Sequence, residues 1–332
     1  MKNQPLLIIR FSSLGDILLT TSFVQALADC YPENPIYYLT KSIYVPLLTY
    51  FPQPVIPIRL EDYSSLPRLA SHLRSLRFLT VFDLHDNLRS HSLQILMRSL
   101  FNRYHKRHLY RVFKTWTHQK TCDLDTSRSY LTALSPSQRP TEPPPVSLLI
   151  PDTFRSPPAE SIRLGIHPGA SYPTKQWPLN YLEQLIEMLL LTGKYRITLI
   201  GGRKEANHLS RIQSGFPSSI EIQGPDLSIE HLIRLIASQD LMLTNDSGPA
   251  HLSSALNIPL LCLFGATHPS LGFAPGNPKT HVMTRSISCS PCTLHGSTAC
   301  PRHHFQCMLS LTPQDVFYQL QTLTRLYYPQ SH

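Results

Sequence analysis

The sequence has 332 residues, of which 42% are hydrophobic and 15% are charged. This composition excludes a disordered or fibrous chain, and the length exceeds that of a usual single domain, so we expect two folded domains. The first apolar run, Leu6 to Ile9, ends at Arg10 and is far too short for a secretory or membrane-spanning segment. We therefore expect a cytoplasmic protein, in which the seven cysteines indicate reduced thiols or metal ligands rather than disulfides.

The net charge of +9 lies mostly in the first half, where residues 1–150 carry 17 Lys or Arg against 10 Asp or Glu. Between Asn87 and Cys122 there is no acidic residue, and aromatic side chains are interleaved with eight bases. These bases are Arg89, Arg98, Arg103, Lys106, Arg107, Arg111, Lys114 and Lys120. A phosphorylated lipid surface or a nucleic-acid backbone would be attracted by such a segment. A solvated helical face is an equally good interpretation.

Short apolar runs alternate with helical patterns before residue 135, which is typical of a parallel sheet with crossover helices. The expected strands are 6–10, 36–39, 55–58 and 78–84, and the expected helices cover 16–31, 66–76 and 90–101. Eight prolines between Ser135 and Pro158 then predict an irregular linker. The alternation restarts with strands at 162–167, 195–200, 220–223, 241–244 and 260–264, and with helices at 181–191, 205–213, 229–238, 248–256 and 313–326. We place the domain boundary between residues 150 and 151.

Asp16 follows the first strand, in the stretch Arg10-Phe11-Ser12-Ser13-Leu14-Gly15-Asp16, where a small-residue turn leads into a helix. A carboxylate in the first turn of a helix is stabilised there, so a capping role explains Asp16 well. The alternative is a general base that takes a proton from an acceptor hydroxyl.

Two further loops join a strand to a helix in the second half. The first is HPGASYPTKQWP, in which Lys175 can neutralise a diphosphate and Trp177 and two prolines fix the loop. The second is TNDSGPAH, in which free amides at the helix start favour phosphate and Ser247, Gly248 and His251 face the same position. Capping of the helix by Asp246 or Ser247 is the structural alternative.

Four cysteines, Cys289, Cys292, Cys300 and Cys307, lie within nineteen residues and are interleaved with histidines. That density suits a tetrahedral structural site for zinc, or iron bound by thiolates. The segment lacks a second CxxC pair, so free cysteines in a turn-rich loop are an equal alternative.

Taken together, these stretches resemble the glycosyltransferase family 9 heptosyltransferases, which build the inner core of lipopolysaccharide. The resemblance is carried by FSSLGDILLTTSFVQAL, HPGASYPTKQWP and NDSGPAHLSSALNIPLLCLFGATHP, followed by the cysteine segment. It implies an α/β fold of the GT-B type, with two Rossmann-like domains facing each other across a cleft. Residues 1–150 would bind the acceptor, and residues 151–332, which include the Cys-rich segment 289–307, would bind the nucleotide sugar.

The resemblance also implies roles for individual residues. Asp16 would be the catalytic base of an inverting reaction, and Lys175 would stabilise the departing diphosphate without a catalytic metal. Ser171 would contact the phosphates, Glu205 the ribose or adenine, and Asp246 the donor sugar, while Ser247, Gly248 and His251 complete the donor site. The implied partners are an ADP-heptose-like donor and an anionic lipid-linked saccharide at the cytoplasmic face of the inner membrane, which the basic segment would contact.

Two other functions fit parts of the sequence. A nucleic-acid-binding protein would use the basic segment and a metal knuckle, but it leaves the three loops unexplained, so we expect no nucleic-acid partner. A GT-B enzyme with another nucleotide sugar or a protein acceptor is the second alternative, because acceptor selection lies in variable loops of the N-terminal half. Asp123-Leu124-Asp125 resembles the DxD element of metal-dependent glycosyltransferases, but it lies far from any strand end and is expected to be surface.

Overall fold

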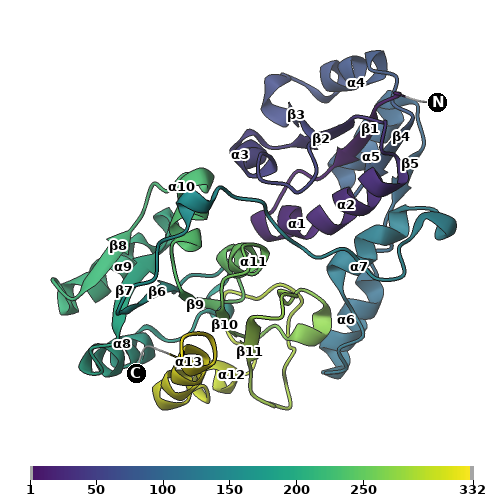
Figure 1. Cartoon of the computed structure of the whole chain (residues 1–332). Coiled ribbons are helices and arrows are strands. Elements are labelled where there is room, and N and C mark those ends of the chain that lie inside the picture. Colours follow the sequence, from purple (N-terminus) through teal and green to yellow (C-terminus); the bar gives the residue numbers. More distant parts are fainter. Residues whose placement is uncertain (1–2, 330–332) are drawn as a thin grey trace. The chain divides into compact units, whose positions relative to one another are not determined.

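A computed structural model describes residues 3–329, which form two compact α/β units (Figure 1). The first unit comprises the chain up to Arg107 together with Asp125–Ile150. The second comprises His108–Leu124 and the chain from Pro151 onward. Each unit contains one parallel sheet with helices packed against it.

The sheet of the first unit has five described strands in the order β3-β2-β1-β4-β5, all parallel. They are β1 Leu6–Ile9, β2 Ile36–Thr40, β3 Ile56–Arg59, β4 Thr80–Asp83 and β5 Phe101–Arg103. The helices are α1 Leu14–Leu19, α2 Thr21–Cys30, α3 Val45–Leu48, α4 Leu66–Ser75, α5 Leu88–Met97 and α7 Thr126–Tyr130. Leu7 and Ile9 pack in one core with apolar residues of α4 and α5. Phe82, which points to the other face of β4, contacts Phe23 of α2.

The first helix differs from its prediction, because the expected continuous helix is divided into α1 and α2 at Thr20. The Thr20 hydroxyl donates to the carbonyl of Ile17 at 2.6 Å and lies 2.8 Å from the hydroxyl of Tyr38. Such bonding back to the preceding turn competes with the regular helical pattern.

The sheet of the second unit has six described strands in the order β11-β10-β9-β6-β7-β8, also parallel. They are β6 Ile162–His167, β7 Tyr195–Ile200, β8 Ile220–Gln223, β9 Leu241–Asn245, β10 Leu260–Leu263 and β11 Thr280–Met283. The helices are α8 Leu179–Leu191, α9 Ala206–Gly215, α10 Ile229–Ala237, α11 Gly248–Ala255, α12 Gln306–Leu309 and α13 Pro313–Tyr327. Apolar residues of α8 and α13 share one core with alternate residues of the strands.

In both sheets the first strand lies in the interior, and the chain builds outward on each side of it. In the first unit β1 lies between β2 and β4, and in the second unit β6 lies between β7 and β9. Ligands of doubly wound α/β folds bind at the carboxyl ends of the strands at this change of direction. Asp16 follows β1, Lys175 follows β6 and Asp246 follows β9, so all three lie at such an edge of their own sheet.

The structure corrects the predicted domain division for one segment, His108–Leu124, which belongs to the second unit. It contains α6, His108–Thr117, whose buried Arg111 donates to the carbonyl of Leu271 at 3.0 Å. Buried Lys114 donates to the carbonyl of Ser270 and pairs with the carboxylate of Asp123. These long-range bonds attach the segment to the second unit. They also remove two of the eight bases from the surface, so the predicted basic face is smaller than its composition indicates.

The proline-rich region carries only two described single-turn 3-10 helices, Pro136–Gln138 and Asp152–Phe154, as a linker requires. Within residues 3–329, none of the helices has the length and apolar character needed to cross a bilayer.

Candidate functional site

Asp16 lies in the first turn of α1, and its Oδ2 atom accepts hydrogen bonds from Ser13 through both the backbone N–H (3.1 Å) and the hydroxyl (2.8 Å). The capping role expected for this carboxylate is therefore present. The same oxygen also lies 2.7 Å from Nη2 of Arg10. With 28% of its side chain exposed, Asp16 is paired and still reachable by solvent or a substrate.

Arg10 is the partner that the sequence pattern did not reveal. It is almost fully buried at the end of β1, and its guanidinium donates to the carbonyls of Ser12 (2.7 Å) and Leu84 (2.6 Å). Burial alone would lower the pKa of Arg10, but the nearby Tyr130 and Asp16 more than offset this and raise it. A fixed cation against the Asp16 carboxylate favours its ionised form, which is the form that a general base needs.

In the second unit, Lys175 and Asp246 form a buried ion pair, with Nζ of Lys175 2.7 Å from Oδ2 of Asp246. Thr267 donates its hydroxyl to the same carboxylate oxygen at 2.8 Å. Lys175 lies in the loop after β6, and Asp246 lies in the loop after β9. The two strands are neighbours in the sheet, with His167 opposite Thr244. The strand order thus brings together two predicted residues that lie far apart in the sequence.

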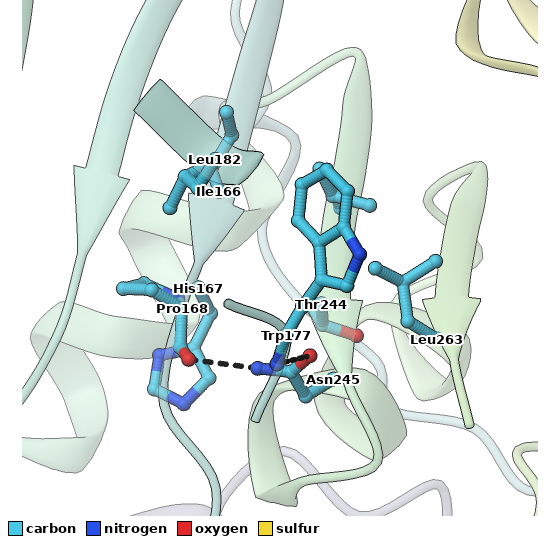
Figure 2. Close-up of a pocket in the computed structure, with 9 residues that line it drawn as sticks. Ile166, His167, Pro168, Trp177, Leu182, Thr244, Asn245 and Leu263 are labelled. Carbon is cyan, nitrogen blue, oxygen red and sulfur yellow. Dashed lines mark hydrogen bonds between the residues drawn. The ribbon is translucent and has the colours of Figure 1, made fainter. Parts of the chain in front are cut away.

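Asn245, the last residue of β9, ties these two loops together (Figure 2). Its Nδ2 donates to the carbonyl of Pro168 at 2.7 Å, and its Oδ1 accepts the backbone N–H of Trp177 at 3.1 Å. The Trp177 ring is buried and donates from Nε1 to the carbonyl of Leu311 at 2.8 Å. Asn245 is therefore a positioning residue for the Lys175 loop, a role that the sequence analysis did not assign.

Ser247 and His251 lie at the start of α11. Ser247 occupies the N-cap position, and its hydroxyl is buried and has no hydrogen-bond partner in residues 3–329. Gly248 and Pro249 form the first turn, and His251 is buried one turn further on. A buried hydroxyl without a partner costs free energy unless a ligand supplies the bond. Together with the free amides of a helix start, this favours an anion at the position.

Glu205 and Ser171 are placed differently from each other. Glu205 is buried, and its Oε2 accepts the backbone N–H of Gly202 at 2.9 Å. Its side chain also lies against Gly169, where an added Cβ would come within 2.3 Å of Oε1. Glu205 thus borders the loop after β6, while Ser171 lies exposed on that loop.

The cysteine segment brings its thiols close enough to influence one another. Burial, followed by the neighbouring Cys292, Cys300 and Cys289, raises the pKa of Cys307 to about 12. Cys289 lies 3.6 Å from Nε2 of His304. In the described part of the chain, the one set of three ligand atoms within 4.8 Å of one another is that of Asp83, Asp86 and His91. Arg103 pairs with both of these aspartates, which explains their proximity without a metal.

The same segment supports the Lys175 loop. Thr174 donates its hydroxyl to the carbonyl of Ser297 at 2.9 Å and accepts the Ser297 N–H at 2.8 Å. Gly296 has φ +100°, and an added Cβ there would come within 2.8 Å of Tyr172 and 3.0 Å of Lys175. Residues between Cys292 and Cys300 therefore pack directly on the loop that carries Lys175.

The fold is of the GT-B type, with two α/β units in which the first strand lies in the interior of the sheet. One unit carries a carboxylate after its first strand, and the other carries a lysine and a helix start that suits a phosphate. The family model for glycosyltransferase family 9 (heptosyltransferase) matches residues 67–301, and the chain belongs to this family.

Among curated relatives, lipooligosaccharide heptosyltransferase 2 of Campylobacter jejuni is 28% identical over 166 residues, which are 48% of this chain and 51% of that protein. The chain spans about half the length of the curated relatives it matches. Escherichia coli ADP-heptose lps heptosyltransferase II has the same fold, with a TM-score of 0.77, 22% identity and coverage of 96% of this chain and 98% of that one. TibC, an iron-containing dodecameric glycosyltransferase of enterotoxigenic E. coli, has a TM-score of 0.63 and 16% identity, with coverage of 98% and 77%.

Proposed function

We propose that this protein is an inverting glycosyltransferase that transfers a heptose from an ADP-heptose donor to the inner core of lipopolysaccharide. The observation that carries the proposal is the Lys175–Asp246 ion pair at the carboxyl edge of the second sheet, in a chain of family 9. The next residue, Ser247, has a hydroxyl without a hydrogen-bond partner in residues 3–329. We expect the acceptor to be an anionic lipid-linked saccharide and the protein to act in the cytoplasm, at the inner face of the inner membrane.

The donor diphosphate would bind at the start of α11. The Ser247 hydroxyl and the backbone N–H groups of Gly248 and Ala250 donate to its oxygens, and His251 lies one turn behind them. Lys175 neutralises the negative charge that develops as ADP departs, so we expect no metal to be required for catalysis. Ser171 lies on the same loop for a phosphate contact, and Glu205 is available to the ribose or adenine.

Asp16 would act on the acceptor. Its carboxylate takes the proton of an acceptor hydroxyl, whose oxygen forms a bond to the anomeric carbon while the bond to the diphosphate breaks. Attack from the face opposite the leaving group inverts the anomeric configuration. Arg10 keeps Asp16 ionised for this step, and Asp246 orients the donor sugar while it holds Lys175.

We also propose that Cys289, Cys292, Cys300 and Cys307 hold a structural zinc or iron ion. Support comes from the four thiols within nineteen residues of sequence, from the histidine beside Cys289, and from the thiolate ligands that both metals accept. Tetrahedral coordination would draw the four sulfurs closer to one another than they lie in this structure. The ion would fix the segment that packs on the Lys175 loop and would take no part in the transfer step.

Isothermal titration with ADP, UDP and ADP-heptose tests the donor assignment. We expect binding of ADP and ADP-heptose and little binding of UDP. A preference for UDP would overturn the ADP-heptose assignment in favour of another nucleotide sugar. Failure to bind any of the three would reject the proposed donor site.

A further inference from the structure

Helix α6 presents its apolar face to solvent and its cationic residues to the protein. Leu109, Val112, Phe113 and Trp116 have exposed fractions of 84%, 42%, 44% and 78%. Their spacing places them on one face of the helix. The opposite face carries Arg111 and Lys114, which are 3% and 0% exposed. This is the reverse of the arrangement in an ordinary surface helix.

The buried cations hold this orientation in place. Lys114 bonds to the carbonyl of Ser270 and to Thr121, and it pairs with Asp123. Arg111 donates to the carbonyl of Leu271, and its guanidinium lies 4.6 Å from the centre of the Phe273 ring. Turning the apolar face inward would break these contacts and leave two cations without their partners, which is strongly unfavourable. The outward apolar face is therefore a stable feature of the fold.

Exposed apolar side chains are concentrated in this part of the chain. Of fifteen large hydrophobic residues exposed in the described structure, eight lie between Leu88 and Trp116. The same stretch has no acidic residue, and Lys106 and Arg107 directly precede α6. Within α6, the exposed side chains of Leu109, Val112, Phe113 and Trp116 form one apolar face. Exposed apolar surface of this kind marks a site that is covered by a partner or a membrane.

We infer that α6 lies in the headgroup region of an anionic bilayer, with Leu109, Val112, Phe113 and Trp116 inserted toward the acyl chains. An amphipathic helix with an aromatic and aliphatic face and adjoining bases is the kind that binds at such an interface. Pairing of two copies through this face would bring Lys106 and Arg107, which directly precede α6, close to the same bases of the second copy, which their charge disfavours. The inference deepens the proposed function, since it names the surface through which the enzyme reaches a lipid-linked acceptor.

Vesicle flotation of the 332-residue chain tests this inference without donor or acceptor, so its failure is distinguishable from failure of the proposed activity. The vesicles contain phosphatidylcholine alone or phosphatidylcholine with phosphatidylglycerol. The test variant is Val112→Ser with Trp116→Ser. The matched control is Leu191→Ser with Leu326→Ser, which removes two exposed leucines of the second unit, 88% and 59% accessible. Circular dichroism and thermal melting establish that both variants fold.

We expect the wild type to bind the anionic vesicles and the control to bind them as the wild type does. The test variant should bind them with an affinity at least about tenfold lower. Brominated lipids should quench Trp116, whereas Trp177, at 5% exposure, gives a constant background. Absence of wild-type binding, or equal loss in the control, would overturn the inference. A concentration-dependent dimer that forms without vesicle binding and is lost in the test variant would also overturn it, in favour of a second copy.

Discussion

Nζ of Lys175 lies 2.7 Å from Oδ2 of Asp246, and both side chains are about nine-tenths buried. The lysine therefore carries its charge beside a carboxylate that Thr267 also contacts. A diphosphate that binds at the start of α11 would compete with Asp246 for this cation. The ion pair thus stabilises the fold and also holds Lys175 where it can bind the diphosphate leaving group.

Lys175→Ala should reduce stability as well as donor binding, because it leaves Asp246 buried without its counter-charge. We expect a loss of about 3 kcal/mol in the free energy of unfolding. The double variant Lys175→Met/Asp246→Asn should recover most of that loss and still bind ADP poorly. Denaturant unfolding and titration of ADP separate the two effects. Normal ADP affinity in the folded double variant would exclude Lys175 from the donor site.

Ser247→Ala should weaken ADP binding without destabilising the protein, because the hydroxyl has no partner in residues 3–329. We expect about a tenfold loss of affinity, equivalent to one hydrogen bond of about 1.4 kcal/mol. Ser253→Ala on the same helix is the matched control, since its hydroxyl already donates to the carbonyl of Pro249 at 2.8 Å. The control should lose about 1 kcal/mol of stability and keep its ADP affinity. The reverse pattern in the two variants would reject an anion contact at Ser247.

Asp16→Asn should lower kcat by roughly 10²–10⁴-fold, the usual contribution of a general base. ADP affinity should stay at the wild-type value, because Asp16 belongs to the first unit. Asp29→Asn, at an exposed position on α2, controls for the loss of one negative charge. Steady-state kinetics provide the measurement, and an unchanged kcat in Asp16→Asn would refute the base assignment.

His85 should make the protein less stable at mildly acidic pH. Burial, followed by the charge of Arg10, lowers the pKa of His85 from its ordinary 6.5 to about 4. Below pH 6.5 the unfolded chain binds a proton that the folded protein does not, so the free energy of unfolding falls as pH drops toward 4. Since the ring is half-buried and solvent screens part of the effect, we expect this contribution to be about 1–2 kcal/mol.

Replacing His85 with Gln should remove that part of the pH dependence. Unfolding by denaturant at about pH 7 and about pH 5 measures it, with exposed His72→Gln as the control that keeps the wild-type slope. An equal slope in His85→Gln and the wild type would mean that His85 is protonated equally in the folded and unfolded states.

The cysteine segment should contain about one zinc or iron ion per chain when the protein is purified without chelators. Cys292→Ser and Cys300→Ser should each lose the metal, and ADP affinity should fall because Gly296 and Ser297 support the Lys175 loop. Cys30→Ser in the first unit is the control. Elemental analysis and titration of ADP supply the two readouts. Metal content unaffected by either variant would exclude these thiols as ligands.

Most strands and the three loops could be predicted from the sequence, because short apolar runs that end in small polar residues have few other stable arrangements. The partners of the site residues could not. Lys175 meets Asp246 only because β6 pairs with β9, and Asp16 meets Arg10 only because the loop after β1 folds back. Strand order and loop closure depend on tertiary packing, which no local pattern reports.

For three of the elements that were missed or misinterpreted, β5, β11 and α6, the reason can be identified. β5 has only three residues and β11 is half-buried, so both edge strands lack a distinct apolar run. The segment that contains α6 was interpreted through its charges as a basic face. The groups that stabilise Lys114 and Arg111 inside the protein include carbonyls more than 150 positions away in the sequence. Helical periodicity alone would have turned the apolar face of α6 inward.

Transfer itself is the most direct test of the proposed function. The wild type and Asp16→Asn are incubated with ADP-heptose and a lipid-linked inner-core saccharide, and the products are analysed by mass spectrometry and by NMR of the new glycosidic bond. We predict that the wild type adds a heptose with inverted configuration and releases ADP in equal amount, and that Asp16→Asn does neither at a comparable rate. Transfer from a uridine nucleotide sugar but not from ADP-heptose, or undiminished transfer by Asp16→Asn, would contradict the account.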